Sequence, residues 1–169
     1  MKEKHLFTSD FKLKFCGYGE WVEEPDLVEF TYNGIDCRIH RILLKEPYTK
    51  EEAWYGGHLC GAIRIPEDHA LYKKDWLDIS IDCHGGLMFA EKEKDGYWIG
   101  FKCMHIGDIT PSMEILRKRF QIQSDDFYNK MKEAYPDCHW LNPTYKSISY
   151  CIAECKSMAD QLLSLEVNK

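Results

Sequence analysis

The residues of this chain that could do chemistry gather in one segment, residues 82–108, which reads DCHGGLMFAEKEKDGYWIGFKCMHIGD. It holds two histidines, two cysteines, a Gly-Gly pair and a closing Gly-Asp. Such residues serve three kinds of site: a metal centre, a cysteine nucleophile with a histidine base, or a pocket that binds a small anion through backbone N–H groups.

A metal centre would use ligand types that this region supplies: His84, Cys103, His105 and Asp108, with His58 and Cys60 from a neighbouring strand. Cys103 and His105 are two residues apart, so on a strand their side chains point the same way. The spacing matches no zinc signature such as His-Glu-x-x-His or paired Cys-x-x-Cys. The alternative is a buried cysteine and a hydrogen-bonded histidine at a strand end, and we expect no metal.

A cysteine nucleophile would need a nearby base that activates its thiol. Cys103 and His105 offer the better pair, with His84 approaching from the partner strand. The adjacent residues Cys83 and His84 would face opposite ways on a strand. The chain has no oxyanion motif such as Gly-x-Ser-x-Gly. We therefore predict no catalytic residue and expect binding rather than turnover.

An anion pocket would use the glycines in CHGGL and HIGD, because a residue without a side chain lets backbone N–H groups approach a ligand. The two motifs flank one predicted hairpin. Since antiparallel strands reverse direction, we expect the motifs at opposite ends of that strand pair, unless His84 belongs to the preceding strand or the sheet bends at the glycines. The plainer alternative is that Gly85 and Gly86 only form a tight turn with positive φ.

The elements that must position these residues begin with a β-hairpin. Residues 28–32 and 35–39 alternate hydrophobic and polar side chains, and the Asn33-Gly34 pair between them tolerates the positive φ angles of a type I′ turn. Further strands are predicted over 58–65, 76–82, 86–91 and 97–103, the last two forming a hairpin through the turn KEKDG.

The second half of the chain turns helical. A first-turn proline favours a helix over residues 111–120, and two aspartates at 125–126 suit the start of another. Hydrophobic residues then repeat at helical spacing over 148–163, the strongest helical pattern in the chain. Strands first and helices later predict an α+β fold: a single domain over 1–169, with a mostly antiparallel sheet, C-terminal helices packed on one face and an insertion at 43–56.

Composition limits the partners. The net charge is −6 and no run is rich in lysine or arginine, so we expect no nucleic-acid surface. No apolar run approaches the roughly 20 residues that cross a bilayer, and the N-terminus has no apolar h-region or cleavage site. We therefore expect no membrane association and a cytoplasmic location, in which the eight cysteines stay reduced.

Three segments resemble a family of small proteins encoded by bacteriophages and prophages: GHLCGAIRIPEDHALYKKDWLDISIDCHGGLMF, YWIGFKCMHIGD and YCIAECKSMADQL. Members of the family carry a Gly-x-x-Cys-Gly-Tyr-Val strand, an Ile-Pro-x-x-His-Pro segment and a His-Gly-Gly-Leu-Thr turn. A Gly-Phe-Asp-Cys-x-His-x-Gly-Asp block and a Glu-Cys-x-x-Leu-Ala-x-Gln-Leu helix follow. The match covers roughly half of the chain in the same order.

Two positions depart from the family pattern. The threonine after His-Gly-Gly-Leu is Met88 here, and the aspartate of Gly-Phe-Asp-Cys is Lys102. A lysine cannot replace an aspartate that binds metal or acts as a catalytic acid, so this change argues against an enzyme.

The resemblance implies a phage or prophage accessory protein in the cytoplasm of a host bacterium. One class of small phage proteins captures nucleotide immune signals as stoichiometric sponges, an anti-defence role that needs no catalytic constellation. By analogy we expect a small nucleotide-derived ligand as partner and no cofactor. The expected ligand-binding residues are His84, Gly85, Gly86, His105 and Asp108, with His58, Arg38 and Trp98 as further contributors.

Each of these residues has an expected role. Histidine side chains and glycine N–H groups would bind phosphate, Asp108 would accept from a ribose hydroxyl, and Trp98 would stack on a base. Two other functions stay open: a hydrolase of a similar ligand, with His105 as base and a metal, and an inhibitor that binds a host protein through its surface. A homo-oligomer stays open as well.

Overall fold

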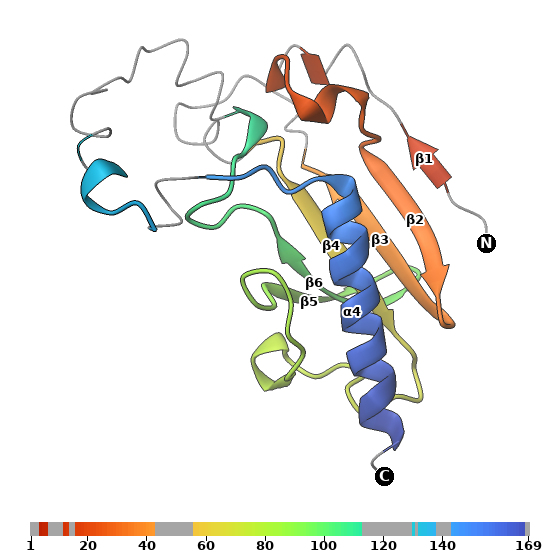
Figure 1. Ribbon diagram of the computed structural model, residues 1–169. Helices are drawn as coiled ribbons and strands as arrows, with labels where there is room; N and C mark the ends of the chain where they lie inside the picture. The colour runs from red at the N-terminus through yellow and green to blue at the C-terminus, as the bar shows by residue number, and fades with distance from the viewer. Residues whose placement is uncertain are drawn as a thin grey trace.

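One antiparallel sheet forms the framework, and a long helix covers one of its faces (Figure 1). The structure is a computed structural model that describes residues 4–6, 12–13, 16–42, 56–112, 130, 132–137 and 143–167. The strands are β1 (Lys4–Leu6), β2 (Leu27–Tyr32), β3 (Ile35–Arg41), β4 (Leu59–Ile65), β5 (Phe89–Glu93) and β6 (Gly96–Lys102). They pair in the order β1-β2-β3-β4-β6-β5, and each pairing is antiparallel.

The last described element, α4 (Ile148–Val167), packs across β3 and β4. Its buried stripe includes Cys151 and Cys155, both 0% exposed, as their spacing of four residues predicts. Gly61 on β4 lets the helix approach, because a Cβ there would overlap the Phe101 ring and lie 3.0 Å from the Cys155 sulfur. The prediction of an α+β fold with helical packing on one face is confirmed.

Both predicted hairpins form. The β2–β3 turn has φ angles of 50° at Asn33 and 86° at Gly34, as a type I′ turn requires. The predicted insertion at 43–56 lies outside the described residues except for its last residue. The residues on either side of this segment are hydrogen-bonded to each other: Ile42 N donates to His58 O at 2.9 Å, and Gly57 N donates to Ile42 O at 2.7 Å.

Most of the two helices predicted in the middle of the chain lies outside the described residues. Of the helix predicted over 111–120, the first two residues are described and are helical. Of the helix predicted to start at 125–126, residues 130 and 132–134 are described and helical.

The prediction of a strand over residues 76–82 is wrong. The segment opens with a 3-10 helix, η3 (Trp76–Asp78), and pairs with no strand among the described residues. The alternation puts Leu77, Ile79 and Ile81 on one face, and the two isoleucines are buried, but Leu77, inside the 3-10 helix, is 75% exposed. The backbone of Asp82, however, pairs with the side-chain amide of Gln161 on α4, in two hydrogen bonds of 2.8 Å each. A helix side chain thus takes the place of a strand partner.

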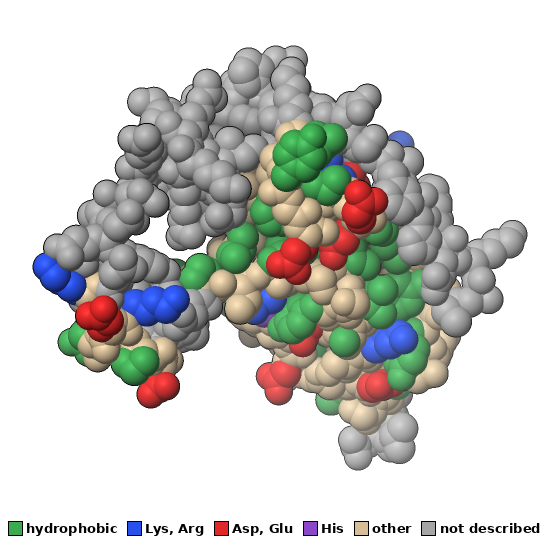
Figure 2. Space-filling view, turned by 45° about the horizontal axis from the view of Figure 1, so that its top comes forward, with side chains coloured by type: hydrophobic (Ala, Val, Ile, Leu, Met, Phe, Trp, Pro, Cys, Tyr) green, Lys and Arg blue, Asp and Glu red, His purple; other side chains and the backbone are tan. Residues whose placement is uncertain are grey.

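The surface of the described residues mixes charges. On the face shown in Figure 2, basic side chains are interspersed with acidic ones rather than gathered in a patch. Within the described ranges, no helix has the combination of length and apolar sequence that crossing a bilayer needs.

A buried charge network joins the start of the chain, β3 and the start of α4. Arg41 lies at its centre: Nε contacts Asp26 Oδ1 at 2.8 Å, and Nη2 contacts Glu24 Oε2 at 2.9 Å. Lys12, 1% exposed, pairs with the same Asp26 oxygen at 3.1 Å. Glu24 also accepts from Ile148 N at 2.8 Å, so the network holds the first turn of α4.

We expect Arg41→Met to destabilise the fold by about 3–5 kcal/mol, because it leaves buried carboxylates without their main partner. Urea unfolding followed by circular dichroism measures the change. Arg64→Met is the matched control, since Arg64 pairs with Asp36 at the surface, with 41% of its side chain exposed, and should change stability by only about 0–1 kcal/mol. Equal effects of the two substitutions would contradict the assigned role of the network.

Candidate functional site

The motifs CHGGL and HIGD lie side by side, at the open end of the β5–β6 hairpin. Phe89, the first residue of β5, pairs with Gly100 near the end of β6, and Met88 N donates to Gly100 O at 2.8 Å. The expectation of opposite ends is therefore wrong. In an antiparallel hairpin the start of the first strand and the end of the second share the open end, so no bend is needed.

Each motif forms a β-turn with glycine at its third position. The turns span residues 83–86 and 105–108, and each is closed by a 2.9 Å bond from the fourth N–H to the first carbonyl. The φ angle is 66° at Gly85 and 96° at Gly107, values that favour glycine. A Cβ on Gly85 would overlap the imidazole of His105, so the two turns are in direct contact.

Asp108 is the buried hub of the site, with 3% of its side chain exposed. Its Oδ2 accepts from His84 Nε2 at 2.8 Å and from the backbone N–H of His105 at 2.9 Å. The Nδ1 atom of His105 lies 3.6 Å from the same oxygen, and Lys146 Nζ lies 3.8 Å from Oδ1. We call His84, His105 and Asp108 the histidine–aspartate centre.

The environment keeps Asp108 ionised. Burial by itself would raise the pKa of Asp108. The hydrogen bonds from His84 and from the His105 N–H, with the nearby charge of Lys146, outweigh burial and hold the pKa below its ordinary value of 3.8. An ionised carboxylate only accepts hydrogen bonds, so His84 donates through Nε2.

Two residues of the helix α4 form hydrogen bonds with His84. Tyr150 OH lies 3.0 Å from His84 Nδ1, and Glu154 accepts from His84 N at 2.8 Å. Burial, and then the charge of Glu154, raises the pKa of Tyr150 to about 12, so the hydroxyl keeps its proton at neutral pH. Both ring nitrogens of His84 are therefore engaged, which fixes the orientation of the ring.

Sequence reasoning missed the contributions of Lys146, Tyr150 and Glu154. Lys146 reaches the centre because Thr144 pairs with the second turn, through bonds of 2.9 Å to Gly107 and Ile109. That pairing leaves no local pattern in the sequence. Tyr150 and Glu154, by contrast, could have been found from the sequence. They are four residues apart on the predicted helix, and each directly precedes a buried cysteine.

The cysteines of the segment lack the features of a nucleophile. Burial raises the pKa of Cys83 to about 12. The Cys103 sulfur lies 3.6 Å from that of Cys151 in the core, and this contact, together with burial, raises the pKa of Cys103 far above its usual range. Both thiols stay protonated at neutral pH, which argues against the nucleophile interpretation.

Three further predicted residues lie away from the centre. His58 is buried at the start of β4, 4% exposed, beside the end of β3. Arg38 and Trp98 lie on the face of the sheet opposite α4, where the Arg38 guanidinium covers the Trp98 ring at 4.2 Å from its centroid. Trp98 is only 4% exposed, so stacking on a base would require Arg38 to move.

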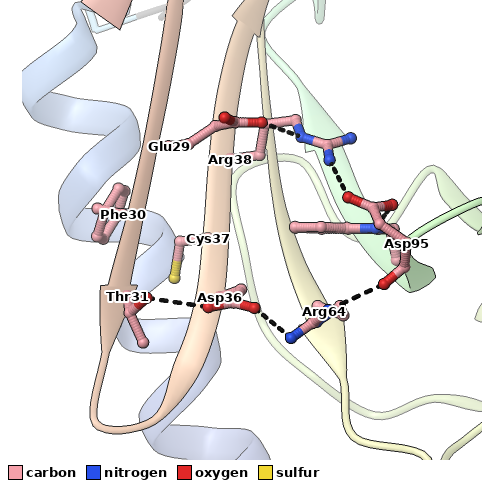
Figure 3. Close-up of a pocket in the computed structure, with 9 residues that line it drawn as sticks. Glu29, Phe30, Thr31, Asp36, Cys37, Arg38, Arg64 and Asp95 are labelled. Carbon is pink, nitrogen blue, oxygen red and sulfur yellow. Dashed lines mark hydrogen bonds and ion pairs between the residues drawn. The ribbon is translucent and has the colours of Figure 1, made fainter. Parts of the chain in front are cut away.

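Arg38 borders a shallow pocket of about 220 Å³ on that opposite face (Figure 3). Its guanidinium contacts Glu93 and Asp95 at 2.7 Å each and Glu29 at 3.3 Å, while Arg64 contacts Asp36. Sites for drug-sized ligands usually measure about 300–1,000 Å³. The pocket is smaller than this, and its two arginines are already paired with carboxylates, so the histidine–aspartate centre is the stronger candidate site.

Lys102 also lies on the opposite face of β6, where it pairs in register with Cys60. Its neighbours Phe101 and Cys103 point towards α4 and are buried. The change from aspartate to lysine at this position therefore does not touch the histidine–aspartate centre. The argument against an enzyme that we drew from Lys102 loses its basis.

The contact between the turns predicts different effects at two neighbouring glycines. Both Gly85 and Gly86 have positive φ, 66° and 85°, so alanine strains the backbone at each. Only at Gly85 would the new Cβ overlap His105, whereas at Gly86 it meets nothing within 4 Å. We expect Gly85→Ala to shift the His105 ring resonances in NMR spectra and Gly86→Ala to leave them in place. Equal shifts in both variants would contradict this packing.

The lowered pKa of Asp108 predicts how stability depends on pH. A carboxyl whose folded pKa lies below its unfolded value stabilises the fold above the unfolded pKa, near 3.8 here, and that contribution is lost as pH falls further. Asp108→Asn should therefore lower stability at pH 7, and the difference from the wild type should shrink towards pH 2.5. Urea unfolding across this range checks the prediction, with the exposed Asp68→Asn as control. A difference independent of pH would contradict it.

No known protein family, curated protein or solved structure matches this chain. The resemblance to phage proteins stays a prediction that rests on the motifs alone. The function is therefore inferred from the chemistry of the histidine–aspartate centre.

Proposed function

We propose that this protein binds a small phosphate-bearing ligand of nucleotide type at the histidine–aspartate centre and holds it without turnover. One observation supports this most: two outward groups that can carry positive charge, His105 and Lys146, flank the buried carboxylate of Asp108. Their side chains are 30% and 20% exposed, respectively, whereas that of Asp108 is 3% exposed. A phosphate would meet the Lys146 ammonium and the His105 ring and not the carboxylate.

The roles within the centre differ from those expected from sequence. Asp108 accepts hydrogen bonds from both histidine residues, so in this proposal it orients them instead of binding a ribose hydroxyl. His84 is locked between Asp108 and Tyr150 and acts as a positioning residue. His105 and Lys146 contact the ligand, because charge-assisted hydrogen bonds to phosphate are the strong ones.

Two features support holding the ligand over converting it. The thiols of Cys83 and Cys103 are protonated and do not offer a nucleophile. The low pKa of Asp108 makes it a weak base, poorly matched to proton transfer at neutral pH. In the phage setting that the motifs suggest, such binding would sequester a host immune signal. A hydrolase is the second candidate, because two histidines and a carboxylate converge here.

Native mass spectrometry of the protein, mixed with cyclic dinucleotides, cyclic trinucleotides and ADP-ribose derivatives, separates these functions. We expect one panel member to give a stable adduct and to return chemically intact when the protein is denatured. Conversion of the ligand with turnover would instead establish the hydrolase. If the protein formed no adduct with any member of the panel, the proposal would be contradicted.

Substitutions locate the binding site once a panel ligand is found. We expect His84→Ala and His105→Ala each to weaken its binding by about 10–100-fold, the effect of losing a charge-assisted bond or the residue that orients it. Arg38→Ala is the control, because Arg38 lies on the opposite face of the sheet and should bind normally. Full affinity in both histidine variants would rule out this site.

A further inference from the structure

We infer that His84, His105 and Asp108 bind one divalent transition-metal ion of the zinc or iron type, and that this ion takes a phosphate oxygen of the ligand. The first statement stands on the geometry of the centre alone. The second rests on the proposed function.

The distances within the centre suit a shared ion. One ligand atom from each of the three side chains can be chosen so that all lie within 4.8 Å of one another. Two atoms that each lie about 2.0–2.2 Å from a zinc ion are separated by roughly 3–3.6 Å, and by at most the sum of the two bonds. The separations here are 2.8 Å from His84 Nε2 and 3.6 Å from His105 Nδ1, each to Asp108 Oδ2. To share an ion, the His84 and Asp108 atoms must move slightly apart, and the two histidine nitrogens, which lie within 4.8 Å of one another, must lie no more than about 4.4 Å apart.

His105 supplies an independent indication. Its Nδ1 atom is buried and has no hydrogen-bond partner among the described residues; the same holds for His40 Nδ1 on the opposite face, but only the His105 atom faces a carboxylate of the centre. A buried ring nitrogen without a partner is costly, and buried polar atoms nearly always have one. This nitrogen faces the Asp108 carboxylate, 3.6 Å from Oδ2, which is too long for a hydrogen bond but suits two atoms on one ion.

The surroundings of His84 are those that a metal ligand needs. A ligating histidine commonly donates its other ring N–H to a fixed acceptor, which sets the tautomer and the ring orientation. When Nε2 binds the ion, the ring proton is on Nδ1, which donates a hydrogen bond to the Tyr150 hydroxyl 3.0 Å away. The carboxylate is fixed as well, because the His105 N–H donates to Asp108 Oδ2.

The ligand set indicates the class of ion and how it would act. Two imidazoles with one carboxylate favour zinc or iron over magnesium or calcium, which prefer oxygen ligands. The positive charge of Lys146 repels a metal ion. Its Nζ, however, lies 3.8 Å from Asp108 Oδ1, so the other carboxylate oxygen, Oδ2, stays available for the ion. Three protein ligands leave at least one coordination position open, and a phosphate oxygen beside Lys146 would fill it.

Cobalt titration of chelator-treated, tag-free protein tests the site, since Co²⁺ replaces Zn²⁺ and gives visible absorption bands. We expect saturation at one ion per chain and displacement of Co²⁺ by Zn²⁺. His105→Ala and Asp108→Asn should each weaken binding at least about tenfold. His40→Ala is the control: His40 lies on the opposite face of β3 and should leave binding unchanged. The thermal melting of each metal-free variant shows whether it still folds.

The outcomes are distinct. No uptake by the wild type, uptake that survives both substitutions in folded protein, or a spectrum dominated by cysteine-to-cobalt charge transfer would each overturn the metal site. The titration contains no nucleotide, so its result does not depend on ligand capture. The protein could bind Co²⁺ at this site and still bind a panel nucleotide after the metal has been removed by a chelator. In that case the ion does not bind the phosphate of the ligand, and the proposed function stands without it.

Discussion

The buried contact between Glu24 and Arg41 is the interaction on which the rest of the molecule depends. Glu24 accepts from the first N–H of α4, and Arg41 at the end of β3 fixes the position of that carboxylate. Because a helix is rigid, anchoring its first residue also sets where Tyr150, in the first turn, and Glu154, one turn further, lie. A charge network at the start of α4 thus helps to orient His84, which both of these residues contact.

The pattern of β2, β3 and the last helix followed from one buried and one less buried face, whereas β4 and β6 are buried on both faces over most of their length. Alternation revealed the two hairpins, and the helical repeat revealed α4. The failure over residues 76–82 has a clear physical reason. Alternation found the two buried isoleucines but not the exposed Leu77, and it cannot show what pairs with the backbone, which for Asp82 is the Gln161 amide of α4.

The candidate site was predictable only in part. His84, His105 and Asp108 stood out by residue type beside glycines, and the structure brings these three together. Their neighbours Lys146 and Tyr150 come from a distant part of the chain, and no spacing rule connects them to the turns. Arg38 and Trp98 were chosen for their chemistry, but strand register places them on the other face of the sheet, where they pack on each other.

The centre draws on two turns in the middle of the chain and on a helix that follows all of the described strands. During synthesis on the ribosome, the sheet and both turns emerge before α4 does. A nascent or truncated chain without α4 lacks the hydroxyl and the carboxylate that hold His84. The assembled centre therefore forms only after α4 has been made and has packed on the sheet.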